Sequence, residues 1–263
     1  MLVFFQFSYI IIKNVDEAFT FIATNYVRSK CLQAGSSCRE IPCDTITIKA
    51  GVHTLRRKAD LLVMKQLIYL DNAATTKTRP EVVEAMLPYF TEYYGNPSSV
   101  YEFSAEPKRA IAQARETIAK ALGAKSNEIY FTYGGTESDN WALISTAEAY
   151  QAKGKHIITT KIEHHAILHT CEYLEQRGFE VTYLDVDEFG VVKLDELEKA
   201  IRPDTILISV MFANNEIGTI EPIKEIGEIA KKHGILFHTD AVQAFCHVTI
   251  NVDECHIDML SSS

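Results

Sequence analysis

From residue 64 onward, short apolar runs of strand length alternate with longer amphipathic stretches of helix length. This alternation is typical of an α/β fold, in which helices connect the strands of a mostly parallel sheet. Three of the helical stretches are followed directly by glycine, the usual residue just after a helix. The expected helices cover residues 80–92, 105–122, 137–152, 165–177, 194–201 and 223–233. The expected strands cover residues 129–132, 156–159, 180–184, 205–212, 235–239 and 257–260.

The N-terminal part of the chain has a different character. A β-like apolar start at residues 3–12 leads into a short helical stretch, a segment rich in serine and cysteine, and the basic run at residues 53–58. No group of residues in it indicates a particular chemistry. We therefore divide the chain into a segment of unknown role at residues 1–63 and an α/β domain at residues 64–263.

Composition excludes several classes of function. A net charge of −9 argues against a nucleic-acid-binding or anionic-membrane-binding protein, because both need a basic face. The longest uncharged run, residues 1–12, is shorter than the roughly 20 apolar residues of a membrane span and lacks the basic start of a signal peptide. The six cysteines form no C-x-x-C pair and no zinc-binding spacing. We expect a cytoplasmic protein with reduced thiols and no metal site.

Polar clusters follow several of the expected strands, and ligands of open α/β sheets bind beyond such strand ends. After the strand at residues 129–132, Gly134 and Gly135 precede a helix that begins near Thr136. Backbone N–H groups at a helix N-terminus can bind phosphate, and glycine lets an anion approach the backbone closely. Helix capping, with Thr136 and Asp139 as a capping box, is an equally good interpretation.

Three further clusters follow later strands. His164 could stack on an aromatic cofactor and transfer protons, although a histidine in a loop is more often only solvated. The Asn214-Asn215 pair also suits an ordinary turn. Asp240 directly follows an apolar strand, where a buried carboxylate needs a partner such as a protonated pyridine nitrogen. The alternative for Asp240 is an exposed residue at a helix N-cap.

Taken together, these motifs resemble the cysteine desulfurases, which depend on pyridoxal 5′-phosphate (PLP) and belong to the class V aminotransferase family. The resemblance extends in order and spacing from about residue 68 to residue 263, and is strongest to the iron–sulfur-assembly and nitrogenase-maturation branch. The motifs that carry it are Leu70-Asp-Asn-Ala-Ala-Thr-Thr76, Gly95-Asn-Pro-Ser-Ser99, Gly134-Gly-Thr-Glu-Ser-Asp-Asn140, Glu163-His-His165, Asn214-Asn-Glu-Ile-Gly218 and His238-Thr-Asp-Ala-Val-Gln243.

The resemblance implies a fold and a set of roles. The fold would be the large domain of a fold type I PLP-dependent transferase, incomplete at the C-terminus. Ring contacts would come from His164, which stacks on the pyridine ring and acts as acid and base, and from Asp240, which pairs with its nitrogen. The remaining cofactor contacts would be Gly135, Thr136 and Ser263 to the phosphate, and Asn215 and Gln243 to the ring oxygen O3′.

The resemblance also implies residues that the chain does not contain. The family's Schiff-base lysine would lie three positions beyond Ser263, and its nucleophilic cysteine lies farther downstream. We therefore expect a truncated chain without desulfurase turnover of its own. We expect Lys161 at the surface and Cys171, Cys246 and Cys255 as packing residues.

The activity implied for the family is conversion of L-cysteine to L-alanine, with a persulfide passed to a scaffold or carrier protein. Full-length members are homodimers. Two alternatives remain open. One is another class V PLP enzyme, such as a selenocysteine lyase or an aminotransferase. The other is a non-catalytic chain in which residues 1–63 bind a partner.

Overall fold

The structure, a computed structural model, describes residues 2–6 and 68–263. The chain divides into one compact unit of residues 1–8 and 73–263 and a second unit of residues 9–72. The strands of the first unit are β1 (Leu2–Gln6), β2 (Ile129–Thr132), β3 (His156–Thr160), β4 (Glu180–Leu184), β5 (Thr205–Ser209), β6 (Leu236–Asp240) and β7 (Met259–Ser261). Its α-helices are α3 (Pro80–Met86), α4 (Pro88–Thr91), α5 (Ala105–Leu122), α6 (Gly135–Tyr150), α7 (His165–Glu175), α8 (Leu194–Ala200) and α9 (Ile223–His233).

The seven strands form one sheet in the order β2-β1-β7-β6-β5-β3-β4. Every pairing between these strands is parallel, which confirms the expected α/β fold. From β3 the chain adds β4 on one side and then β5, β6 and β7 on the other. The strand order therefore reverses between β3 and β5. Such a switch point is where open α/β sheets bind their ligands.

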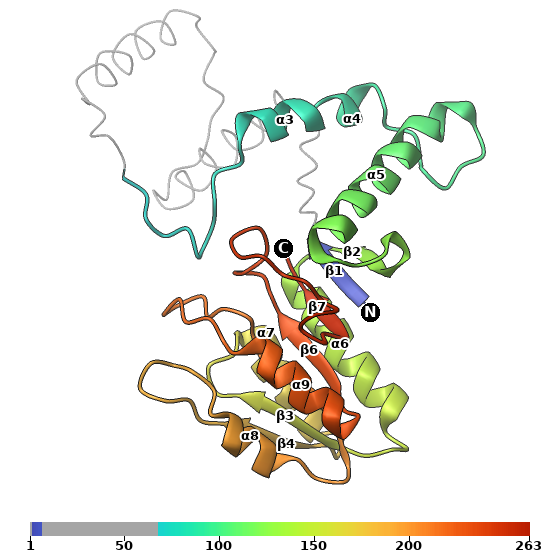
Figure 1. Ribbon diagram of the computed structural model, residues 1–263. Helices are drawn as coiled ribbons and strands as arrows, with labels where there is room; N and C mark the ends of the chain where they lie inside the picture. Colours follow the sequence, from blue (N-terminus) through green and yellow to red (C-terminus); the bar gives the residue numbers. More distant parts are fainter. Residues whose placement is uncertain (1, 7–67) are drawn as a thin grey trace, which may run out of the picture. The chain divides into compact units, whose positions relative to one another are not determined.

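Helices cover both faces of the sheet (Figure 1). Helices α6 and α7 pack together on one face, where they form a core with Ile157 and Leu207. Helices α5, α8 and α9 contribute to a separate core on the other face, together with Ile158 and Phe237. Ile157 and Ile158 are consecutive residues of β3 and enter different cores, because successive side chains of a strand point to opposite faces.

The sequence predicts α5 and α9 to the residue. Both end at a glycine in the left-handed conformation, Gly123 with φ 71° and Gly234 with φ 65°. The single helix expected at residues 80–92 is wrong, because α3 ends at Met86 and Pro88 starts a separate helix. Proline lacks an N–H group and clashes with the preceding turn, so it separates the two helices.

Two of the strands expected after residue 64 differ by more than one residue from their expected bounds. Strand β5 ends at Ser209 rather than Phe212, although the N–H groups of Val210 and Phe212 still donate to carbonyls of residues 238 and 240. Strand β7 runs from Met259 to Ser261 and so starts two residues later than expected, because the N–H of Ile257 turns back to the carbonyl of Val252. The expected division at residue 63 falls outside the described residues and remains a prediction.

Candidate functional site

The polar clusters predicted from the sequence lie at the carboxyl ends of four parallel strands, of which β6, β5 and β3 are adjacent and β2 lies farther along the sheet. Asp240, the last residue of β6, is the register partner of Ser261 in β7. The carbonyl of Asp240 accepts a hydrogen bond from the N–H of Phe212, which leaves β5, at 2.8 Å. His164 follows the end of β3 by four residues and is the N-cap of α7. These segments therefore lie together at the carboxyl ends of the strands, as the family resemblance implies.

The turn between β2 and α6 leads into a helix N-terminus that no side chain caps. Gly134 is the N-cap of α6 with an extended backbone. The first N–H groups of an α-helix have no acceptor within the helix, so they can bind an anion. The alternative capping box is wrong, because Thr136 lies inside the helix and Asp139 is buried.

Gly135 brings this turn into contact with the segment that follows β6. A Cβ atom built on Gly135 would lie 2.7 Å from Cγ2 of Val242, closer than a real side chain tolerates. Val242 stands between Asp240 and Gln243, so only glycine permits this approach without a shift. The candidate phosphate loop and the candidate ring-nitrogen contact are therefore neighbours.

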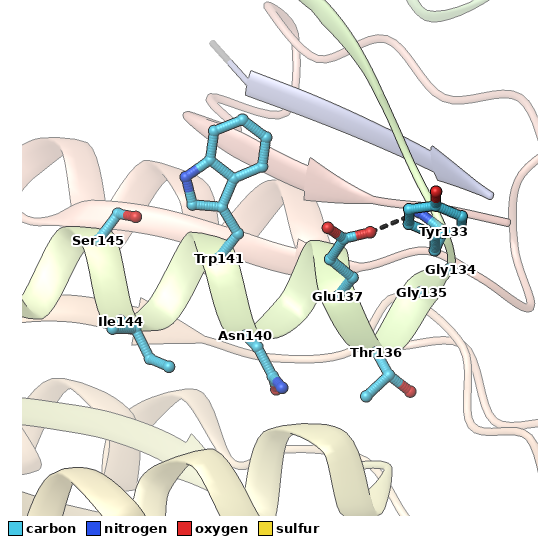
Figure 2. Close-up of a pocket in the computed structure, with 9 residues that line it drawn as sticks. All are labelled: Tyr133, Gly134, Gly135, Thr136, Glu137, Asn140, Trp141, Ile144 and Ser145. Carbon is cyan, nitrogen blue, oxygen red and sulfur yellow. Dashed lines mark hydrogen bonds between the residues drawn. The ribbon is translucent and has the colours of Figure 1, made fainter. Parts of the chain in front are cut away.

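Two open cavities flank the N-terminal half of α6. The first, of about 660 Å³, is drawn in Figure 2, where Thr136, Asn140 and Ile144 point to one side of the helix and Trp141 and Ser145 to the other. The second, of about 480 Å³, has Thr136, Asn140 and Ile144 in its wall as well. Thr136 thus borders both cavities, and the second brings it together with His164.

His164 occupies a defined position at the start of α7. It is the N-cap residue, and its Nδ1 accepts a hydrogen bond from the N–H of Ala166 at 3.1 Å. Because Nδ1 is an acceptor here, a neutral His164 carries its proton on Nε2. The exposed side chain lines the second cavity. This arrangement leaves Nε2 as the atom that can exchange a proton with a ligand.

Asp240 is buried, so the exposed N-cap expected as the alternative is wrong. Its Oδ1 accepts a hydrogen bond from the N–H of Val242 at 2.9 Å, and among the described residues it forms no ion pair with lysine or arginine. Burial raises the pKa of Asp240, while its hydrogen bond to Val242 and the nearby His164 oppose this shift. A buried carboxyl group of this kind fits a protonated ring nitrogen as its partner.

The other three predicted cofactor contacts lie outside the walls of the two cavities. Asn215 is half-buried, and its Nδ2 lies 3.5 Å from Oε1 of Glu216. The half-buried Gln243 donates from Nε2 to the carbonyl of Ala73 at 3.5 Å. Ser263 is exposed and follows β7 by two residues. None of the three lines either cavity, and their cofactor roles remain predictions.

A group of buried polar residues behind the strand ends was not predicted from the sequence. His238 is fully buried, with Nδ1 2.9 Å from Oγ of Ser209 and Nε2 3.0 Å from Oγ of Ser261. Burial lowers the pKa of His238 to about 3, so the ring is neutral. Asp139 on α6 is also buried, and its pKa is raised by burial and by the charge of Asp240. A histidine inside a predicted strand, as His238 is, was the sequence feature that could have indicated this group.

The predictions for lysine and cysteine are only partly correct. Nζ of the exposed Lys161 pairs with Asp185 at 2.7 Å, which confirms a surface position. Cys171 is buried and Cys255 half-buried, as packing residues should be. Cys246 is exposed, so its assignment as a packing residue is wrong. Its φ of 65° places it in a left-handed turn rather than in a helix or strand.

Within the described residues, no group of three or more histidine, cysteine or acidic residues could hold a metal ion. The helices described at residues 68–263 are all too short or too polar to cross a membrane. The three cysteines before residue 64 lie outside the described part of the chain.

Comparisons with known proteins identify relatives of this chain. The cysteine desulfurase IscS of Methanosarcina thermophila is 67% identical over 196 residues, which are 74% of this chain and 48% of that protein. The IscS of Clostridium botulinum (strain Kyoto / Type A2) is 62% identical over 200 residues, 76% of this chain and 50% of the relative. The chain thus spans about half the length of the curated relatives it matches.

Solved structures give the same result. The structure of SspA in complex with cysteine superposes with a TM-score of 0.73 at 45% identity, over 75% of this chain and 57% of that one. A NifS-like protein also reaches a TM-score of 0.73, at 44% identity over 74% of this chain and 54% of its own. Residues 68–263 match the family described as Aminotransferase class-V. The resemblance to cysteine desulfurases is confirmed, and the chain belongs to the class V aminotransferase family of PLP-dependent enzymes.

Proposed function

We propose that this chain supplies the PLP-binding half of a cysteine desulfurase. The observation that carries the proposal is Asp240, a buried carboxyl group at the end of β6 near His164. A buried acid without a lysine or arginine partner among the described residues fits a cationic ring nitrogen. The contact between Gly135 and Val242 adds support, because it brings a helix N-terminus beside this acid.

Each residue has a distinct task in this proposal. The N–H groups at Gly135 and Thr136, together with Ser263, would hold the phosphate. Asp240 would keep the ring nitrogen protonated through its opposite charge. Asn215 and Gln243 would donate hydrogen bonds to the oxygen O3′. Bound PLP would supply an electron-withdrawing ring that stabilises a carbanion at the substrate's Cα.

His164 has the acid–base role. Its Nδ1 accepts a hydrogen bond from the N–H of Ala166, so Nε2 is the ring nitrogen left to exchange a proton. Its exposed imidazole can also stack on the pyridine ring. The same side chain would then hold the ring in place and move a proton at the substrate.

The proposed substrate is L-cysteine. The sulfur atom leaves the substrate for an enzyme thiol, so that L-cysteine and one thiol give L-alanine and one persulfide. The persulfide then goes to a sulfur-accepting scaffold or carrier protein. The relatives named IscS and the SspA structure with cysteine support this substrate. We place the full-length enzyme in the cytoplasm as a homodimer.

A chimera tests the proposed function. Residues 68–263 replace the matching half of the M. thermophila relative, whose remaining half completes the enzyme. We expect PLP-dependent formation of alanine and sulfide from L-cysteine in the presence of a thiol reductant. The polypeptide of residues 1–263 alone should give none, because the lysine and the sulfur-accepting cysteine implied by the resemblance are absent from it.

The substrate used by the chimera separates the alternatives. Turnover of L-selenocysteine without turnover of L-cysteine would favour a selenocysteine lyase, and amino transfer to a keto acid would favour an aminotransferase. A folded chimera that binds PLP but does nothing with any of these substrates would contradict the proposal. The alternative in which residues 1–63 bind a partner concerns a segment of which the structure describes only residues 2–6.

A further inference from the structure

Glu163 is a buried acid at the switch point of the sheet, in the turn between β3 and α7. Its Oε1 accepts two hydrogen bonds, from Oγ1 of Thr160 at 2.7 Å and from the N–H of Met211 at 3.0 Å. Thr160 ends β3, whereas Met211 lies in the segment that leaves β5. The carboxyl group therefore joins the exits of the two strands between which the strand order reverses.

Asn214 makes a second connection between the same two segments. Its Nδ2 donates to the carbonyl of Ile162 at 2.8 Å, and its Oδ1 accepts from the N–H groups of Glu216 and Ile217 at 2.8 and 3.0 Å. The turn before α7 and the turn after β5 are thus tied to each other by side chains at two points.

The two tied turns carry candidate contacts to the cofactor ring. His164 follows Glu163 directly, and Asn215 follows Asn214 directly. Neither Glu163 nor Asn214 lines either of the two cavities beside α6, so each acts on a ligand only through its neighbour. We propose that Glu163 is a positioning residue that, as a neutral acid, holds the turn of His164 against the turn of Asn215 and so sets both for the PLP ring. This inference rests on the proposed function.

The surroundings of Glu163 favour the neutral acid. The titratable groups that face it from the packed elements are Asp240 at the end of β6, Asp139 on α6, Glu221 before α9 and Cys171 on α7. All of these are acids. Oε2 of Glu163 has no hydrogen-bond partner among the described residues. A buried carboxylate without compensation costs far more than a neutral carboxyl group.

Burial and the charges of Asp240 and Glu221 raise the pKa of Glu163 to about 8, although its hydrogen bonds to Thr160 and Met211 oppose the shift. The group is therefore protonated near neutral pH and ionises in mildly alkaline solution. Ionisation of Glu163 places its negative charge close to that of Asp240. We expect the carboxylate then to move toward water and to release the N–H of Met211.

Amide exchange of Met211 tests, without any cofactor, whether Glu163 holds the two turns together. The full chain is compared with Glu163→Gln, which keeps an acceptor oxygen and cannot ionise, with Glu163→Ala, and with Glu228→Gln as an exposed control on α9. After correction for intrinsic exchange, protection of Met211 in the wild type and the control should fall about tenfold between pH 7 and pH 9, one unit above the pKa. In Glu163→Gln it should stay constant.

Two results would show that Glu163 does not hold the turns together. One is that Glu163→Ala keeps the Met211 protection of the wild type, and the other is that the fall in Met211 protection between pH 7 and pH 9 persists unchanged in Glu163→Gln. Should Glu163→Ala not fold, the comparison of Glu163→Gln with the wild type decides alone.

Binding of pyridoxamine 5′-phosphate, which needs no lysine, tests the positioning role. We expect Glu163→Gln to bind as the wild type does at pH 7 and Glu163→Ala about tenfold more weakly, a change of about 1.4 kcal/mol. Equal binding by all three would overturn the positioning role and leave the proposed function standing. No binding by the wild type would overturn the proposed function and the positioning role with it.

Discussion

Nε2 of His238 in β6 lies 3.0 Å from Oγ of Ser261 in β7, and this contact joins the two strands near their carboxyl ends. The ring is fully buried and reaches Ser209 in β5 through its other nitrogen. One neutral imidazole therefore connects β5, β6 and β7 just behind Asp240.

His238 should make the protein sensitive to acid. The pKa of His238 falls to about 3 on folding, below the value of about 6.5 in an unfolded chain. Below pH 6.5 the unfolded state binds the proton more readily, so stability falls with pH by up to about 1.4 kcal/mol per unit until about pH 3. Urea unfolding between pH 4 and pH 7 measures this slope. His238→Gln should reduce it, and an unchanged slope would contradict the assignment.

Cysteine reactivity should separate two positions clearly. Cys246 is exposed, whereas burial raises the pKa of the Cys171 thiol to about 12. Because the thiolate is the reactive form, iodoacetamide at pH 8 should modify Cys246 and leave Cys171 intact in the folded protein. Peptide mapping by mass spectrometry reads both sites, and the urea-unfolded protein provides the control in which both react. Equal labelling of the two in the native protein would show that Cys171 is not buried as described.

The region of α3 and α4 should make the isolated chain prone to self-association. Neither helix buries a residue, and Leu87 and Phe90 are 57% and 51% exposed. Contiguous exposed apolar surface of this kind favours association. Sedimentation velocity should show species larger than a monomer that increase with concentration. The double variant Leu87→Lys, Phe90→Lys should shift the distribution toward monomer, whereas Lys108→Glu on α5 should not.

A strictly monomeric wild type across the concentration range would contradict this prediction. So would a double variant that associates as strongly as the wild type.

Local signals in the sequence define most of the helices and strands. Helices α5 and α9 have amphipathic patterns and end at Gly123 and Gly234, so both their type and their ends are predictable. The break at Pro88 could have been predicted, since proline removes a backbone donor. It was missed because the apolar pattern continues across it. The end of β5 depends on its neighbour β6 and has no local signal.

The candidate site was predictable where a polar residue directly follows an apolar strand. Asp240 met that condition, and its burial agrees with the predicted ring-nitrogen role. The burial of Glu163 and Asp139 was not predictable, because it arises from segments distant in sequence. The contact between Gly135 and Val242 joins residues 107 positions apart, and no local pattern could indicate it.

The proposed cofactor site is tested most directly by equilibrium binding of pyridoxamine 5′-phosphate to the chain and to Asp240→Ala, with the exposed Asp253→Ala as control. Cofactor fluorescence at low micromolar protein gives both affinities. We predict saturable binding by the wild type and the control, and a loss of about 10- to 100-fold in Asp240→Ala, as expected for a charge-assisted hydrogen bond. Equal affinity of the wild type and Asp240→Ala would contradict the proposed cofactor site.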